Sequence, residues 1–511
     1  MNRTRRSMLN VAVALFTYAI PLVTAFLVQK VLVLSLGDDY NGINGLFSSI
    51  ISMMSMTDLG IGTAIIYHMY RPMAERDSEK IKSLLKFYKY SYMVISGVVL
   101  LIGVVVAFFL PLLTDGAKIK ENIYLIFVLF IFDCVCSYFL GYKKSMLYAD
   151  MVNFIPDTIY FCVYMVQNAL QIYVLLAFHS YIAFLIIKSM GKIVPNILIS
   201  LYIRVKYPYT AEKNVKPLDS EVRNDIVKKV KGLFLHKIGK LIVTGSDSLV
   251  LTGVVGITAM NLYANYYLVI AGISALFNKG FETLSNSVGN FLLDSSKERN
   301  KDVFKKVEFL NFWLFGTAAV GMYAVMQPLI ELWMGERFLF SETVLIVLVY
   351  NFYLQGVRTS VITFKEAAGI FHEDRFVPVI EAMLNLAVSI VLAMYLGVAG
   401  VFVGTIVSSL VVYLYGYPKY VCGPLFDMSF AKYLWGTVSH LLVLSIAILG
   451  IGGIKMTLAD YNPWGRFFAG GIAAVLVSQI VFFAFYARSA EMRYYIGLIK
   501  GRFGDKASHG E

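Results

Sequence analysis

The sequence predicts an all-α, polytopic membrane protein, and three observations lead to that fold class. Hydrophobic residues fill 58% of the 511 positions, while charged residues fill only 15%. The mean hydropathy is +0.69, whereas a soluble protein of this size carries about 25% charged residues. Apolar runs of about 18 residues or more recur along the chain, and each can cross a hydrocarbon core of about 30 Å as a helix.

Fourteen membrane helices are expected from these runs and from the polar segments between them. Their ranges are 9–36, 43–69, 87–113, 122–142, 150–176, 179–204, 226–256, 260–292, 304–330, 342–369, 376–396, 398–418, 430–454 and 464–487. The stretch that opens 226–256 is basic and amphipathic, so an interfacial helix is the alternative there.

The distribution of cations predicts the orientation in the membrane. With the N-terminus in the cytoplasm, 35 of the 45 Lys and Arg fall in the tails and in loops on the cytoplasmic side. The opposite loops carry five, namely Lys118, Lys120, Arg337, Lys455 and Arg466. Cytoplasmic loops are enriched in Lys and Arg, so both termini are expected in the cytoplasm. The net charge of +12 then indicates contact with anionic lipid headgroups, and nucleic-acid binding is the weaker interpretation.

A faint internal repeat predicts two related halves. The segment L-G-D-D-Y-N-G-I-N-G-L-F-S-S-I-I-S (36–52) matches V-G-I-T-A-M-N-L-Y-A-N-Y-Y-L-V-I-A (255–271) in placement, with a period of about 220 residues. Six helices per half give parallel repeats, which suit alternating access at their interface. The expected organisation is an N-lobe (1–204), a cytoplasmic linker (205–225), a C-lobe (226–422), two added helices (423–487) and a cytoplasmic tail (488–511).

Ionisable residues at membrane depth are the candidate functional residues, because a charge at the bilayer centre costs at least about 2.5–3.5 kcal/mol without a partner or a wet cavity. The basic set is Lys30, Lys188, Lys192, Lys279 and Arg358, and the acidic set is Asp58, Asp133, Asp157, Asp247, Glu282 and Glu381. Lys30, Asp157 and Glu381 lie near enough to helix ends to reach the membrane surface.

The stretch I-I-K-S-M-G-K-I-V-P-N (186–196) places Lys188 and Lys192 four residues apart, where like charges on one helix face repel. Two interpretations are open: ion pairs with Asp58 or Asp133, or a polar cavity whose cations bind an anionic ligand. Lys279 and Arg358 lie as deep in the membrane, so under the second interpretation they are further cations that could bind the anionic ligand. Asp58, Asp133, Asp247 and Glu282 are the candidates for ion pairing or for coupling to Na⁺ or H⁺.

No enzymatic chemistry is indicated. The sequence has no Walker loop, no Ser/His/Asp constellation and no Cys/His spacing typical of a metal site. We therefore expect no catalytic residue, no metal and no bound cofactor.

The sequence resembles the bacterial polysaccharide transporter family of lipid-linked oligosaccharide flippases, in the multidrug/oligosaccharidyl-lipid/polysaccharide exporter superfamily. The likeness rests on the layout of the spans and on three segments, M-T-D-L-G-I-G-T-A-I-I-Y-H-M-Y-R-P-M-A-E-R-D (56–77), G-S-D-S-L-V-L-T-G-V-V-G-I-T-A-M-N-L-Y-A-N-Y (245–266) and L-G-V-A-G-V-F-V-G-T (396–405).

The resemblance implies a V-shaped pair of six-helix lobes around a central cavity in the bacterial cytoplasmic membrane. The implied substrate is an undecaprenyl-pyrophosphate-linked oligosaccharide for capsule or exopolysaccharide synthesis, with a polymerase and glycosyltransferases as partners. Members of the family line this cavity with basic residues that bind the diphosphate. The resemblance assigns that role here to Lys188, Lys192, Lys279 and Arg358. In one branch of the superfamily, the last two helices hold a lipid tail. The alternatives are a multidrug cation antiporter, a lipid II flippase and a non-transporting scaffold of a glycan-synthesis complex.

Overall fold

The computed structural model describes residues 20–21, 23–55, 61–150, 152–212, 215–294, 296–370 and 373–497. Side chains are described throughout these ranges except at 63–64, 229, 231–244, 282–287, 289–291 and 293–294. Over this part of the chain, regular structure is helical and no strand forms. Eleven of the described helices are long and apolar enough to cross a membrane. The expected all-α polytopic fold is confirmed.

The chain divides into two compact units, residues 1–264 and 265–511. Unit 1 contains a helix over Val23–Leu36, α2 (Asp38–Ser55), α3 (Ile61–Glu75), α4 (Ser78–Ala107), α5 (Leu110–Leu113), α6 (Ile123–Tyr138), α7 (Ser145–Ala149), α8 (Phe154–Phe178), α9 (Tyr181–Lys206), α10 (Ser220–Val250) and the start of α11 (Ile257–Asp294). Unit 2 contains the rest of α11, α12 (Lys297–Trp333), α13 (Glu342–Ala367), α14 (Val377–Leu396), α15 (Val398–Val411), α16 (Gly423–Phe426), α17 (Phe430–Thr457) and α18 (Pro463–Tyr486).

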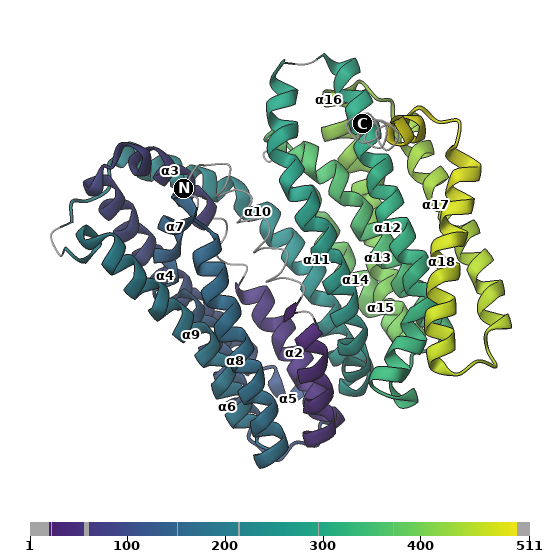
Figure 1. Cartoon of the computed structure of the whole chain (residues 1–511), viewed down its shortest axis with the longest axis horizontal. Coiled ribbons are helices and arrows are strands. Elements are labelled where there is room, and N and C mark those ends of the chain that lie inside the picture. Colours follow the sequence, from purple (N-terminus) through teal and green to yellow (C-terminus); the bar gives the residue numbers. More distant parts are fainter. Residues whose placement is uncertain are drawn as a thin grey trace, which may run out of the picture. The chain divides into compact units, whose positions relative to one another are not determined.

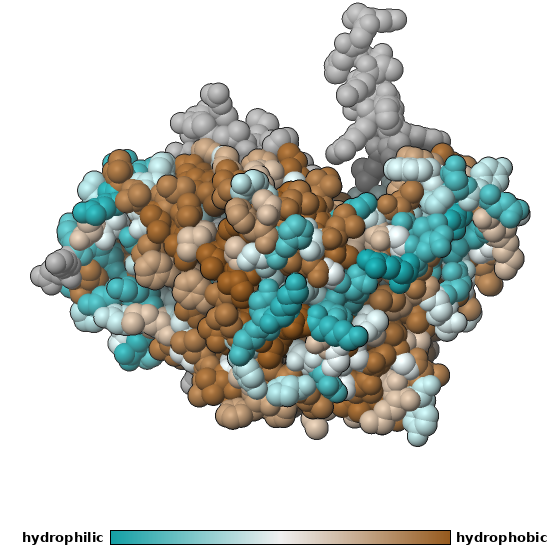
Figure 2. Space-filling model, turned by 90° about the horizontal axis from the view of Figure 1, so that it is seen from below, coloured by the Kyte–Doolittle hydropathy of each residue, from teal (hydrophilic) through white to brown (hydrophobic). Residues whose placement is uncertain are grey.

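Within each unit, helices pack both on their neighbours along the chain and on helices far away in the sequence. In unit 1, α9 packs against α8 and α6. In unit 2, α12 packs against α13, α17 and α18, and α14 pairs with α15 (Figure 1). Aromatic rings fill the inside of unit 2, where Phe304 stacks on Phe426 at 4.3 Å between ring centroids and meets Phe364 edge-on. Many apolar side chains remain on the outside, and Figure 2 shows broad apolar areas on the face it presents. Such a surface is matched to lipid rather than to water.

Each of the fourteen expected ranges overlaps a described helix, with local differences. The range 398–418 was expected to be one helix, but α15 passes into two π-helical turns, Val412–Gly416 and Pro418–Cys422. Proline has no N–H to donate to the preceding turn, so the regular α-helical ladder is interrupted at Pro418. The division between the units also differs from the expected linker, because α10 packs on α2 and α3 of unit 1.

The backbone contains the expected repeat. Three pairs of helices begin 219 residues apart: α2 and α11 at Asp38 and Ile257, α4 and α12 at Ser78 and Lys297, and α6 and α13 at Ile123 and Glu342. The residues just before the first pair are both glycines with positive φ, Gly37 at 105° and Gly256 at 118°. Glycine adopts this backbone conformation without the steric cost that a Cβ would bring. The two halves therefore share the positions at which these helices begin, as well as the short polar turn before the first of them.

A close crossing holds α2 against the first two turns of α11 inside unit 1. The side-chain amide of Asn41 donates to the Asn261 Oδ1 at 2.8 Å, and both residues are buried. A Cβ on Gly42 would lie 3.0 Å from the backbone oxygen of Ile257. Small residues let helix backbones approach closely in a membrane, where packing and hydrogen bonds drive association. The crossing therefore depends on the absence of a side chain at Gly42.

We expect Gly42→Leu to destabilise the protein by about 1–3 kcal/mol, the usual cost of overpacking, because the neighbouring backbone cannot yield as a flexible side chain would. Gly97→Leu is the matched control, since Gly97 lies in α4 with nothing within 4 Å of its Cβ position. Thermal unfolding of both variants in detergent measures the difference. Equal melting temperatures for the two variants would contradict the close crossing.

Candidate functional site

The helix α9 presents Lys188 and Lys192 on the side of the helix that packs inside unit 1. Its outward side is marked by the exposed apolar residues Ile186, Met190 and Val194. Two residues further along a helix is a rotation of about 200°, so both lysines lie opposite that stripe. Lys192 is nevertheless exposed, and Lys188 is partly buried. Lys192 is therefore exposed on the side of α9 that also carries its buried residues, rather than on the apolar outer side.

The environment of Lys188 is formed by α6. Its ammonium lies 4.3 Å from the centroid of the Phe130 ring, an attractive cation–π arrangement. Asp133, three residues further along α6, acts on Lys188 electrostatically, but no ion pair within 4.0 Å joins Asp133 to either lysine among the described residues. Asp133 is 7% exposed, and its Oδ1 has no hydrogen-bond partner in this part of the chain. The cluster thus contains two ammonium groups and one carboxylate, none of them neutralised by direct contact.

Polar residues on α8 support this part of α9 and were not singled out in the sequence. A Cβ on Gly191, between the two lysines, would lie 1.7 Å from the Gln167 Oε1, so the Gln167 side chain packs directly over this glycine of α9. Gln171 donates to the backbone oxygen of Phe184 at 3.3 Å, and Asn168 donates to Thr24 at 3.0 Å. Amide side chains on an apolar helix were the signal that could have identified them, since buried polar groups need hydrogen bonds.

Arg358 on α13 lies in a closed network in unit 2. Its Nη1 and Nη2 donate to the two oxygens of Glu381 at 2.6 and 2.9 Å. Its Nε donates to the Tyr417 hydroxyl at 3.1 Å, and Nη1 also donates to Gln355 at 3.1 Å. The side chains of Arg358 and Glu381 are 13% and 4% exposed. The expectation that Glu381 reaches the membrane surface is wrong, because the buried guanidinium holds it inside, and Arg358 is engaged by protein groups rather than open to a ligand.

The remaining candidates are placed separately. Lys279 is exposed on α11, where its neighbour Asn278 is hydrogen-bonded to Thr359 of α13 at 3.0 Å. Asp247 of α10 is 7% exposed, and the next residue, Ser248, donates to Ser49 of α2 at 3.0 Å. Asp58 and the side chain of Glu282 lie outside the described residues. No cluster of His, Cys, Asp or Glu suited to a metal ion occurs in the described part.

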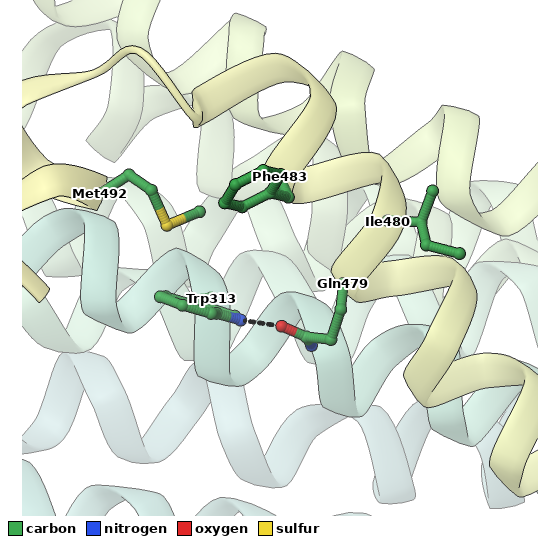
Figure 3. Close-up of a pocket in the computed structure, with 5 residues that line it drawn as sticks. All are labelled: Trp313, Gln479, Ile480, Phe483 and Met492. Atoms are coloured by element: carbon green, nitrogen blue, oxygen red, sulfur yellow. Dashed lines mark hydrogen bonds between the residues drawn. The ribbon is translucent and has the colours of Figure 1, made fainter. Parts of the chain in front are cut away.

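An apolar cavity of about 290 Å³ lies in unit 2 between α12, α18 and the helix over 490–497 (Figure 3). Its walls are Trp313, Gln479, Ile480, Phe483 and Met492. The Trp313 indole donates to the Gln479 Oε1 at 2.7 Å across its floor. The resemblance implied a lipid-tail groove in the last two membrane helices; α18 contributes to this cavity and α17 does not, so the groove stays a prediction.

Comparisons with known proteins identify the fold. No family model and no curated protein matches the sequence. A structure of the lipid II flippase MurJ, in an inward closed conformation, matches over 94% of this chain and 99% of that chain, with a TM-score of 0.65 and 15% identity. An inward-facing multidrug resistance MATE family transporter of the MOP superfamily matches over 84% and 99%, with a TM-score of 0.56 and 13% identity.

The MATE transporter VcmN of Vibrio cholerae also matches, over 80% of this chain and 95% of that chain, with a TM-score of 0.54 and 13% identity. At these identities the likeness establishes the fold and leaves the substrate open. The chain is a multi-pass membrane protein with the fold of MOP-superfamily transporters.

Proposed function

We propose that this protein moves an anionic lipid-linked glycan across the bacterial cytoplasmic membrane by alternating exposure of its polar interior. The observation that carries the proposal is the pair Lys188 and Lys192, which face the inner side of α9 with no carboxylate in direct contact in the described part of the chain. A fold shared with a lipid II flippase supports it. The substrate class we propose is an undecaprenyl-pyrophosphate-linked oligosaccharide for capsule or exopolysaccharide synthesis.

The chemistry of the substrate matches these two lysines. A diphosphate loses its hydration in hydrocarbon and cannot cross a bilayer unaided. Ammonium groups replace that hydration with charge-assisted hydrogen bonds, while a prenyl chain stays in lipid. Net transport then requires that the headgroup bind with different affinity in the inward-open and outward-open states. The partners we propose on this basis are the enzymes that build the repeat unit inside and polymerise it outside.

Asp133 favours a second candidate function, the export of organic cations. A buried carboxylate with one oxygen left without a hydrogen-bond partner among the described residues is a suitable counter-ion for a cationic drug, and MATE transporters share the fold. The two functions make opposite demands on the charges of one cluster. An anionic substrate needs Lys188 and Lys192, whereas a cationic substrate needs Asp133.

We expect Asp133→Asn to leave flipping of a diphosphate-linked glycan at or above the wild-type rate, because the change removes a negative charge beside the proposed anion site. The measurement uses proteoliposomes containing the purified chain and undecaprenyl diphosphate that carries a fluorescent oligosaccharide. A membrane-impermeant quencher reports how fast the label changes leaflet. Ethidium uptake by the same vesicles is the parallel test for cation transport.

Empty vesicles and vesicles with Asp157→Asn serve as controls, since Asp157 is a partly buried carboxylate of α8 outside the α6–α9 cluster. Wild-type vesicles that take up ethidium but do not flip the glycan, with uptake lost in Asp133→Asn, would reject the proposed substrate in favour of the drug antiporter.

A further inference from the structure

A small cavity lies in unit 2 where α17 packs against α12 and α13. Its volume is about 20 Å³. Polar groups on its walls are Glu308, Tyr353, Tyr413, Tyr433, Thr437 and His440. Glu308 lies in the charged segment K-E-R-N-K-D-V-F-K-K-V-E-F (297–309), so in the sequence it resembles its neighbours, which are typical of a surface. In the structure it is partly buried and lines this cavity beside aromatic residues.

Hydrogen bonding within this cavity is incomplete. Tyr413 donates to the backbone oxygen of Leu354 at 2.6 Å, and the Thr437 hydroxyl donates to the backbone oxygen of Tyr433 at 3.3 Å. The hydroxyl of Tyr433 is buried and has no hydrogen-bond partner among the described residues. An unsatisfied buried hydroxyl is unfavourable, so we expect this group to gain a hydrogen-bond partner in another state of the protein.

His440 lies on the wall beside Glu308. Its ring stacks flat on Phe312, with 4.3 Å between centroids and 11° between planes, which fixes the imidazole in the cavity. Glu308 is joined to no cation within 4.0 Å in the part of the chain that the structure describes. A carboxyl, a phenol and an imidazole are therefore gathered here, and none of them is neutralised by an ion pair.

The other groups that surround Glu308 do not supply a compensating charge. The charged residues acting on it are Lys305, on the preceding turn of α12, and Glu491, on the helix over 490–497. These have opposite signs. The remaining titratable groups that Glu308 influences are neutral at ordinary pH, namely Tyr353, Tyr413, Tyr433, Tyr486 and Cys422.

We propose that Glu308 is a proton-binding site, with the Tyr433 hydroxyl and the His440 imidazole as its hydrogen-bond partners in the protonated state. A cavity of about 20 Å³ holds about one water molecule, enough to deliver a proton. Hard metal cations take about six or more oxygen ligands, whereas the side chains of Glu308, Tyr433 and Thr437 together offer four. An ionised carboxylate can only accept a hydrogen bond, whereas the protonated acid can also donate one to the imidazole or to the phenol oxygen.

Protonation of this site changes the packing of four elements at once, because α12, α13, the turn Val412–Gly416 and α17 all contribute to its walls. A ligand shifts a conformational equilibrium only if it binds one state better than the other. A proton meets this requirement if the Glu308 carboxylate is hydrated in one conformational state of the protein and enclosed in the other. This last step, the coupling of the proton to substrate movement, rests on the proposed function.

Proton binding is tested without any substrate. Infrared difference spectra of the full chain in lipid vesicles are recorded between about pH 9 and about pH 6, a range in which surface carboxylates stay ionised. We expect a carboxylic-acid C=O band in the wild type and in Glu298→Gln, an exposed carboxylate on the first turn of α12. We expect loss of that band in Glu308→Gln. A band of unchanged intensity in Glu308→Gln overturns the proposal.

A second variant keeps the test decisive if Glu308→Gln does not fold. Glu308→Asp withdraws the carboxyl by one methylene from Tyr433 and His440, so the band should shift in frequency and in titration midpoint, and an unshifted band counts against the site. In transporting vesicles, an imposed pH gradient should change the flipping rate of the wild type and of Glu298→Gln but not of Glu308→Gln. If no glycan is flipped by any variant, the proposed function fails while the infrared result still decides the proton site.

Discussion

Replacing both lysines of α9 should nearly abolish flipping of a diphosphate-linked glycan. A hydrogen bond to a charged group contributes about 1.5–3 kcal/mol, and about 1.4 kcal/mol corresponds to a factor of ten. Each of Lys188→Ala and Lys192→Ala should therefore lower the rate at limiting substrate by about tenfold or more, and the double variant by about a hundredfold or more. The proteoliposome assay with labelled undecaprenyl diphosphate measures the rates.

Lys206→Ala is the matched control for this experiment. Lys206 lies in the last turn of the same helix and pairs with Asp150 at 3.2 Å, so it is not available to a ligand in the membrane interior. Lys192→Arg should retain more activity than Lys192→Ala, because the charge is kept although its geometry changes. A double alanine variant that inserts normally and flips at the wild-type rate would eliminate the lysine pair as the substrate site.

The positions of the membrane helices could be predicted from the sequence because the bilayer imposes one length and one polarity on every span. The repeat could also be predicted from the sequence, because a polar turn with a glycine recurs where α2 and α11 begin. The shared face of Lys188 and Lys192 follows from helical spacing alone. These features are local, so a single sequence carries them.

The partners of the charged residues could not be predicted, because they depend on contacts between different helices. Arg358 finds Glu381 on the next helix, 23 residues away, and nothing in either segment specifies that pairing. The role of Glu308 could not be predicted from its neighbours in the sequence, since the segment 297–309 contains seven other charged residues and is typical of a surface. Whether a charged side chain is ion-paired, exposed or enclosed depends on how the helices of its unit pack together.

Removing Glu381 should be the most destabilising single change at membrane depth. Glu381→Ala leaves the Arg358 guanidinium enclosed without its carboxylate, and breaking a buried ion pair in this way costs about 3–5 kcal/mol. Glu342→Ala is the control, because Glu342 also pairs with a cation, Lys455 at 2.6 Å, but is 48% exposed. An exposed pair contributes about 0–1 kcal/mol, so the control should unfold close to the wild type. Thermal or denaturant unfolding in detergent measures both.

The double variant Arg358→Met/Glu381→Leu separates stability from transport. Replacing a buried ion pair with apolar residues of similar volume is often neutral or stabilising, so this variant should recover most of the stability lost in Glu381→Ala. If Arg358 serves only its network with Glu381, Tyr417 and Gln355, the double variant should also flip the glycan normally. A stable double variant that binds the glycan headgroup but no longer flips it would instead mean that the pair opens during transport, and that Arg358 reaches the diphosphate in a second state, as the resemblance implied for it.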